Sequence, residues 1–176
     1  MSVEVHHLGL TVSDLERSVE WYCTNLGFRD IGRAHLSGAT ISEQTDLADT
    51  DVDIALLAGE NIVLELLRYA NPLGDAYTLR TCDVGAAHPC VVVRDMEATC
   101  AAMRDRGVAF HARPANLVGQ TLMVYVRDPD GLMIELIQPG EDLQLCTLLD
   151  ASRTASSIEA NQPPDLPPPI GPAKAS

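Results

Sequence analysis

An internal repeat limits the possible folds of this chain more than any other feature. The stretch HHLGLTVSDLE covers residues 6–16, and the similar stretch AHPCVVVRDME covers residues 87–97. His7 matches His88 at an offset of 81 residues, and the Val, Asp and Glu that follow match at the same offset. Each stretch has the pattern of a short strand that leads into a helix. The chain is therefore predicted to contain two copies of one supersecondary unit, neither of which can bury its apolar face alone.

The first module is predicted to have the order βαβββ. Alternating residues from Val3 to Leu10 indicate a strand, and Ser13 with Glu16 form a capping box at the start of a helix. That helix should present an apolar stripe at helical spacing and end at Gly27. Strands are expected at residues 28–36, 51–57 and 62–67, with a loop between the first two.

The second module repeats this order. A strand is expected at residues 89–93, a helix at 95–106 that ends at Gly107, and a short extended piece at 110–113. Strands at 120–126 and 132–137 should flank the turn RDPDG, which has Pro and Gly in suitable positions. The predicted class is therefore α+β, with module one at about 3–70 and module two at about 84–140 of a single domain, residues 1–150. Residues 151–176 are rich in Pro, Ser and Ala and are predicted to be a disordered tail.

The last strands of the modules also align, and each carries one acidic residue among aliphatic ones. NIVLELLRY lies over GLMIELIQP, which matches Glu65 with Glu135. A carboxylate in such a strand must face water or a partner that compensates its burial. Either Glu alone could face solvent, and His7 or His88 alone could be a satisfied core histidine. Together, two imidazoles and two carboxylates related by the repeat suit one divalent cation.

Neighbouring residues help to select these candidates. His6 precedes His7 on the expected strand, so the two should point to opposite faces, with His7 as the inward ligand. Cys90 follows His88 by two residues and is expected to be a buried structural thiol. Tyr125 could point into the cavity from the strand before RDPDG.

Composition excludes several classes of function. The chain carries 25 acidic and 12 basic residues, a formal charge of −13, which disfavours nucleic acid and anionic membranes as partners. The sequence contains no run of about 18 apolar residues, so no membrane span is predicted. The five cysteines are odd in number and form no CxxC pair, which favours a reducing cytoplasm over a disulfide framework.

These motifs resemble the vicinal oxygen chelate superfamily, which includes glyoxalase I, methylmalonyl-CoA epimerase, extradiol dioxygenases and fosfomycin-resistance proteins. The resemblance covers about residues 3–139 and is most specific in VRDPDGLMIELIQP. It implies paired βαβββ modules in a curled half-barrel sheet around a metal, with His7, Glu65, His88 and Glu135 on the ligand positions. It also implies a homodimer, a small-molecule substrate and one divalent ion, either Zn, Mn, Co, Ni or Fe.

The chemistry expected of such a centre is proton transfer next to a carbonyl. A metal with open positions acts as a Lewis acid on two adjacent oxygens, and Glu65 or Glu135 could act as the base. Asp53 lies twelve residues before Glu65, and the corresponding position of module two is Met123. Asp53 could therefore be an additional catalytic acid on one side of the site, or it could simply be one more acidic residue of an acidic loop. Two acids on opposite faces of a substrate would suit an epimerase or isomerase.

The substrate of that epimerase would be small and rich in oxygen, such as a cyclitol ketone or an acyl-CoA-like compound. The alternatives are a lactoylglutathione lyase, an extradiol dioxygenase and a resistance protein that sequesters its ligand without turnover. Binding of glutathione or CoA would favour basic residues at the mouth of the site. Arg68, Arg80 and Arg127 could serve, or they could be ordinary solvated arginines.

Overall fold

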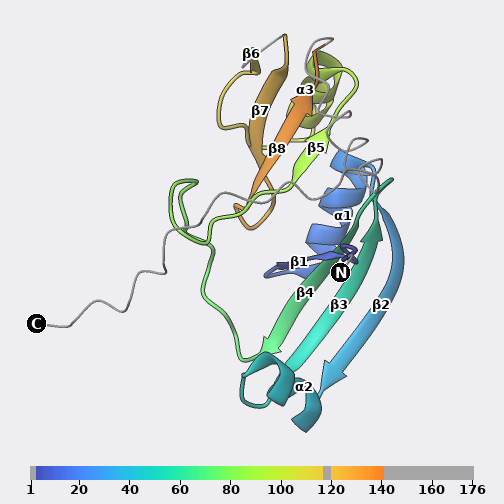
Figure 1. Ribbon diagram of the computed structural model, residues 1–176, viewed down its shortest axis with the longest axis vertical. Coiled ribbons are helices and arrows are strands. Elements are labelled where there is room, and N and C mark those ends of the chain that lie inside the picture. The colour runs from blue at the N-terminus through green and yellow to red at the C-terminus, as the bar shows by residue number, and fades with distance from the viewer. Residues whose placement is uncertain (1–2, 117–119, 141–176) are drawn as a thin grey trace, which may run out of the picture. The chain divides into compact units, whose positions relative to one another are not determined.

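The computed structural model describes residues 3–116 and 120–140, and the predicted tail at 151–176 lies outside this part (Figure 1). Module one consists of β1 (Leu8–Thr11), α1 (Leu15–Leu26), β2 (Arg29–Ser37), α2 (Ala39–Thr45), β3 (Asp51–Ala58) and β4 (Val63–Asn71). Module two consists of β5 (Cys90–Val92), α3 (Met96–Asp105), β6 (Ala115–Asn116), β7 (Leu122–Arg127) and β8 (Met133–Gln138). The α+β class and the two βαβββ modules are confirmed.

Each module forms its own four-stranded mixed sheet. The strand orders are β1-β4-β3-β2 and β5-β8-β7-β6, so the two sheets repeat one topology. In both sheets the first strand runs parallel to the last strand of its module, and the remaining pairs are antiparallel. The pairing among the described residues keeps the sheets separate, and it does not show the curl that a half-barrel would have.

Capping side chains fix the starts of the two long helices, and a glycine ends the first of them. Asp14, not Ser13, is the N-cap of α1, and its side chain accepts a hydrogen bond from the amide of Arg17. Asp95 caps α3 in the same way. The predicted capping box was therefore wrong by one residue. Gly27 does end α1, with a φ of 72° that favours glycine.

Two further elements differ from the expectation. The loop predicted after β2 contains the short helix α2, which buries no side chain and so has no apolar stripe to reveal it. The extended piece predicted at residues 110–113 forms only an isolated bridge between Phe110 and Val126, and the strand β6 follows it.

The helices cover one face of each sheet, and this decides which face is left for a site. Ala55 and Leu57 of β3 belong to the core cluster together with Tyr22 of α1. Side chains that alternate with them point to the other face. In module two, Ile134 and Leu136 of β8 join the same cluster together with three residues of α3, namely Met96, Cys100 and Met103. Both modules thus bury their helix-facing residues in one common core.

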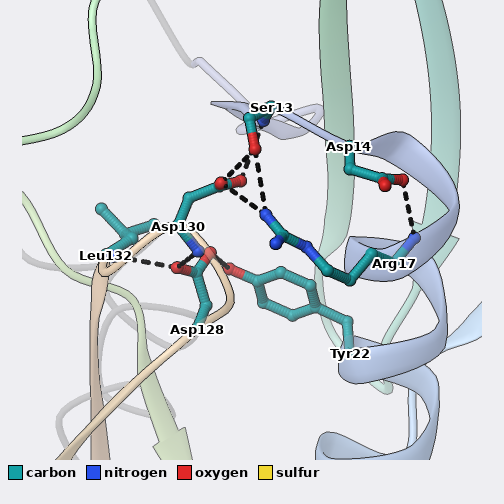
Figure 2. Close-up of polar contacts among 7 residues, drawn as sticks. All are labelled: Ser13, Asp14, Arg17, Tyr22, Asp128, Asp130 and Leu132. Atoms are coloured by element: carbon teal, nitrogen blue, oxygen red, sulfur yellow. Dashed lines mark hydrogen bonds and ion pairs between the residues drawn. The ribbon is translucent and has the colours of Figure 1, made fainter.

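Hydrogen bonds between the start of α1 and the β7–β8 turn connect the modules (Figure 2). The buried Tyr22 hydroxyl donates to Asp128 at 3.0 Å. Asp130 of the same turn accepts from the Ser13 amide at 2.9 Å and from the Arg17 guanidinium at 2.9 Å. The aspartates of the RDPDG motif therefore hold module two against the first turns of α1. No helix in the described part of the chain is long and apolar enough to cross a membrane.

Candidate metal centre

The first candidate pair, half-site A (His7 and Glu65), lies on the sheet face of module one that α1 does not cover. Glu65 is opposite Leu56 in the β3–β4 register, whereas the core residue Leu57 is on the other face. The parallel β1 brings Gly9 beside Glu65, and His7 precedes it by two residues. As a result, Nε2 of His7 lies 3.2 Å from Oε2 of Glu65.

The second pair, half-site B (His88 and Glu135), has the same construction in module two. Nε2 of His88 lies 3.1 Å from Oε2 of Glu135. Two further side chains adjoin this pair, because Cys90 is beside Glu135 in the parallel register and Tyr125 is opposite it in the antiparallel one. The Tyr125 and His88 rings meet edge to face, with centroids 5.3 Å apart. Half-site A has Gly9 and Leu56 at the corresponding positions, so half-site B is the more polar one.

The protonation of these neighbours reflects their position. Burial and the adjacent Glu135 carboxylate raise the pKa of the Cys90 thiol to about 11. The same two causes raise the pKa of Tyr125. Cys90 is nevertheless exposed, so the sequence-based expectation of a buried structural thiol was wrong.

The geometry of each pair fits two neighbouring ligands of one ion. Ligands about 2.1 Å from a metal, at angles between octahedral and tetrahedral, lie about 3.0 to 3.4 Å apart. The measured 3.2 Å and 3.1 Å fall within this interval. An imidazole nitrogen with a carboxylate oxygen also suits a divalent ion of borderline hardness. Both pairs are therefore suitable as halves of a metal centre.

The four candidate ligands do not come together in the described part of a single chain. No group of three or more His, Cys, Asp or Glu side chains suited to a metal occurs among residues 3–116 and 120–140. Each half-site offers two protein ligands, whereas structural zinc sites use four and catalytic ones at least three. The structure thus brings His7 to Glu65 and His88 to Glu135, but does not bring the two pairs together.

Asp53 lies apart from both half-sites. It is opposite Arg68 in the register and three residues before Leu56, so it shares the α1 side of the sheet and not the Glu65 side. Its carboxylate lies 2.9 Å from Nδ1 of His35 and 3.5 Å from the Arg68 guanidinium. The hydrogen bond from His35 lowers the pKa of Asp53, and the same bond raises the pKa of His35. These residues line an open groove of about 720 Å³ next to the start of α1.

The three arginines considered for an anionic substrate all have partners. Arg68 contacts Asp53, and Arg80 forms an ion pair with Asp83 at 2.7 Å. Arg127 shares the Glu135 face by register and donates to the carbonyl of Gly131 at 2.6 Å. Of the three, only Arg127 lies on the face of a half-site.

The His6 ring contacts His7, which contradicts the expectation that they point to opposite faces. Nδ1 of His6 lies 2.7 Å from Nδ1 of His7. The strand β1 begins only at Leu8, so the alternation assumed for residues 3–10 does not yet apply to the histidines. Sequence reasoning missed this contact because the boundary of a strand is its least certain feature.

Comparisons with known proteins agree with this architecture. Residues 4–136 match the family described as Glyoxalase/Bleomycin resistance protein/Dioxygenase superfamily. A "Probable lactoylglutathione lyase" of Synechocystis is 31% identical over 137 residues, which cover 75% of this chain and 92% of that protein. A "2-epi-5-epi-valiolone epimerase" of Actinomyces is 30% identical over 146 residues, which cover 77% and 79%. Three of the curated relatives are named lactoylglutathione lyases.

The fold has a counterpart among solved structures. A glyoxalase family protein from Bacillus cereus superimposes with a TM-score of 0.71 at 19% identity and covers 78% of this chain and 95% of its own. That identity supports the fold alone, whereas the family match spans most of the described residues. The chain belongs to the Glyoxalase/Bleomycin resistance protein/Dioxygenase superfamily.

Proposed function

We propose that this chain is a divalent-metal-dependent enzyme of glyoxalase type, with His7, Glu65, His88 and Glu135 as the metal ligands. One observation carries the proposal: each module holds a His–Glu pair, on the face its helix leaves free, at the separation of two ligands on one ion. Zn, Mn, Co, Ni or Fe would each accept this ligand set. The names of three relatives favour lactoylglutathione lyase activity over the epimerase that the sequence suggested.

The complete centre is proposed to form between two copies of the chain. Half-site A of one copy would face half-site B of the other, and the same contact repeated by the twofold axis would give two equivalent centres. The exposure of the ligands supports this, since the His7 and His88 side chains are 38% and 37% exposed. A second copy would supply the two missing ligands and cover both half-sites.

The proposed reaction moves one proton between adjacent carbons. A lactoyl thioester of glutathione and the adduct of the glutathione thiol with a 2-oxoaldehyde are isomers that differ in this way and in which of the two neighbouring oxygens carries the hydroxyl proton, so a second proton passes from one oxygen to the other. The bound cation would supply Lewis-acid polarisation of the two neighbouring oxygens. Glu65 or Glu135 would remove the proton from the carbon that bears sulfur and return it to the next carbon. Each enters the site from a different half-site, so the two carboxylates can approach a substrate from two sides.

A second candidate is epimerisation of a cyclitol ketone. The relative named 2-epi-5-epi-valiolone epimerase favours it, and two carboxylates from separate half-sites suit removal and return of a proton on opposite faces. In this scheme one Glu is the base and the other the acid. Asp53 has no part in either scheme, and we propose that it stabilises the α1 side of the sheet through His35 and Arg68.

Subunit complementation tests the shared site. The variants His7→Ala and Glu135→Gln each destroy both centres of their own dimer, because every centre needs one intact half-site A and one intact half-site B. Mixed dimers regain one intact centre, so unfolding and refolding an equimolar mixture should restore about one quarter of wild-type activity. The assay follows thioester formation from glutathione and methylglyoxal, and deuterium exchange next to the carbonyl for the cyclitol ketone.

The remaining outcomes separate the alternatives. A mixture as inactive as its parents, with wild-type protein active, would place the complete site within one chain. Absence of bound metal after each ion is added back would refute the metal centre and favour a sequestering protein. Oxygen consumption with a catechol would indicate a dioxygenase. Asp53→Asn serves as the matched acidic control and should keep wild-type metal content and turnover.

A further inference from the structure

His6 and His7 form a contact that the proposed metal site does not by itself require. Their Nδ1 atoms lie 2.7 Å apart, and the rings meet edge to face with centroids 5.0 Å apart and an angle of 84°. His7 directs its other nitrogen, Nε2, toward Glu65 at 3.2 Å. Both nitrogens of the His7 ring therefore have partners, one on each side.

A short contact between two imidazole nitrogens needs one proton between them. Either ring can carry that proton, because neutral imidazole has one donor and one acceptor nitrogen. Without metal, the Glu65 carboxylate favours a proton on Nε2 of His7, and the Nδ1–H of His6 then donates to His7. With a cation on Nε2 of His7, the proton of that ring would be on Nδ1, and His6 would be the acceptor with its own proton on Nε2. The pair satisfies both states without moving either ring.

We infer that His6 is a positioning residue for His7, which it holds with Nε2 directed toward Glu65, where the proposed cation would bind. The inference rests on the proposed function, since it concerns a ligand of the proposed centre. Histidine ligands generally donate their second ring nitrogen to a partner that fixes the tautomer and the orientation of the ring. His88 is supported differently, because its ring packs against Tyr125. The two half-sites thus orient equivalent ligands by different means.

The first test measures metal affinity of the full-length protein with Zn²⁺ and Co²⁺ in competition with a chromophoric chelator. Loss of such an orienting partner costs about 10- to 100-fold in metal affinity, so His6→Ala should weaken binding by that factor. His6→Asn should restore most of it, because its amide oxygen lies about as far from the backbone as Nδ1 does and can accept the His7 proton. Val5→Ala is the matched control in the same segment, at a side chain that is 85% exposed.

The second test does not depend on metal. In ¹⁵N-labelled, metal-free protein at mildly alkaline pH, a scalar coupling across the hydrogen bond should connect the two Nδ1 nuclei. Absence of this coupling would overturn the inference, as would an affinity of His6→Ala equal to that of wild type. If wild type binds neither ion, the proposed centre fails and so does the role of His6 in metal binding. The coupling would then show separately whether His6 still holds the His7 ring.

Discussion

Removing the Tyr22 hydroxyl should destabilise the protein, because it deletes a buried hydrogen bond to a carboxylate. The hydroxyl donates to Oδ2 of Asp128 at 3.0 Å, while Oδ1 accepts the amides of Asp130 at 2.9 Å and Leu132 at 2.8 Å. Tyr22 is 0% and Asp128 6% exposed, so water does not readily replace the lost donor. Burial, followed by the nearby Asp128 carboxylate, raises the pKa of Tyr22, which keeps it protonated as a donor.

The magnitude follows from the charge of the acceptor. A hydrogen bond to a charged group contributes about 1.5–3 kcal/mol, and Tyr22→Phe removes it without changing the packing of the ring. At about 2–4 °C per kcal/mol for a chain of this size, the melting temperature should fall by about 3–12 °C. Urea denaturation followed by tryptophan fluorescence gives the free energy of unfolding directly. The control Tyr69→Phe removes a hydroxyl from a partly exposed tyrosine of β4.

A change below about 0.5 kcal/mol for Tyr22→Phe would refute this reasoning, because that is the range of ordinary surface substitutions. It would mean that Asp128 is neutral or has water as its partner. The contact between α1 and the β7–β8 turn would then depend on Ser13, Arg17 and Asp130 alone.

Three further predictions concern single residues. Burial raises the pKa of Asp128 above its usual value near 3.9. Protonation of Asp128 therefore stabilises the folded state; this stabilisation is complete below about pH 3.9 and is lost as the pH rises through the raised pKa. Wild type should gain stability relative to Asp128→Asn on acidification from neutral pH, as measured by urea denaturation at several pH values. Gly27→Ala should cost about 1 kcal/mol because φ is +72°, whereas Gly32→Ala, whose φ is outside the left-handed region, should not destabilise the protein. At pH 8 a thiol with a pKa of about 11 is ionised in only about one molecule in a thousand. Iodoacetamide should therefore label Cys90 far more slowly than Cys82, which is also exposed, as quantified by mass spectrometry of peptides.

The sequence was sufficient to predict elements with strong periodicity. The two long helices, the hairpins and their alignment follow from apolar spacing and from the repeat itself. The helix α2 was missed because none of its side chains is buried. The N-cap was assigned to Ser13 because Ser and Asp are both good caps, and only the tertiary contact of Ser13 with Asp130 decides between them.

For the candidate site, the sequence predicted which residues pair within a module but not on which face of the sheet Asp53 lies. His7, Glu65, His88 and Glu135 were identified by alignment of the modules, and their pairing within each module agrees with the strand registers. The placement of Asp53 depended instead on a count of residues across a hairpin. A shift of one residue in register turns a side chain to the opposite face, and a spacing in sequence does not fix the register. Asp53 accordingly lies opposite Arg68 on the α1 side.

The distribution of buried residues bears on the proposal that a second copy completes a metal centre. Both modules direct their helix-facing residues into one common core, and the Tyr22–Asp128 contact joins them on that side. The face of module one that holds His7 and Glu65 retains the partly exposed aliphatic residues Leu56 and Leu67. One symmetric contact between half-site A and half-site B would bury both faces at once and complete four ligands in each of two centres. The complementation experiment tests this proposed contact between two copies, whereas the stability of Tyr22→Phe tests the contact that joins the two modules within one copy.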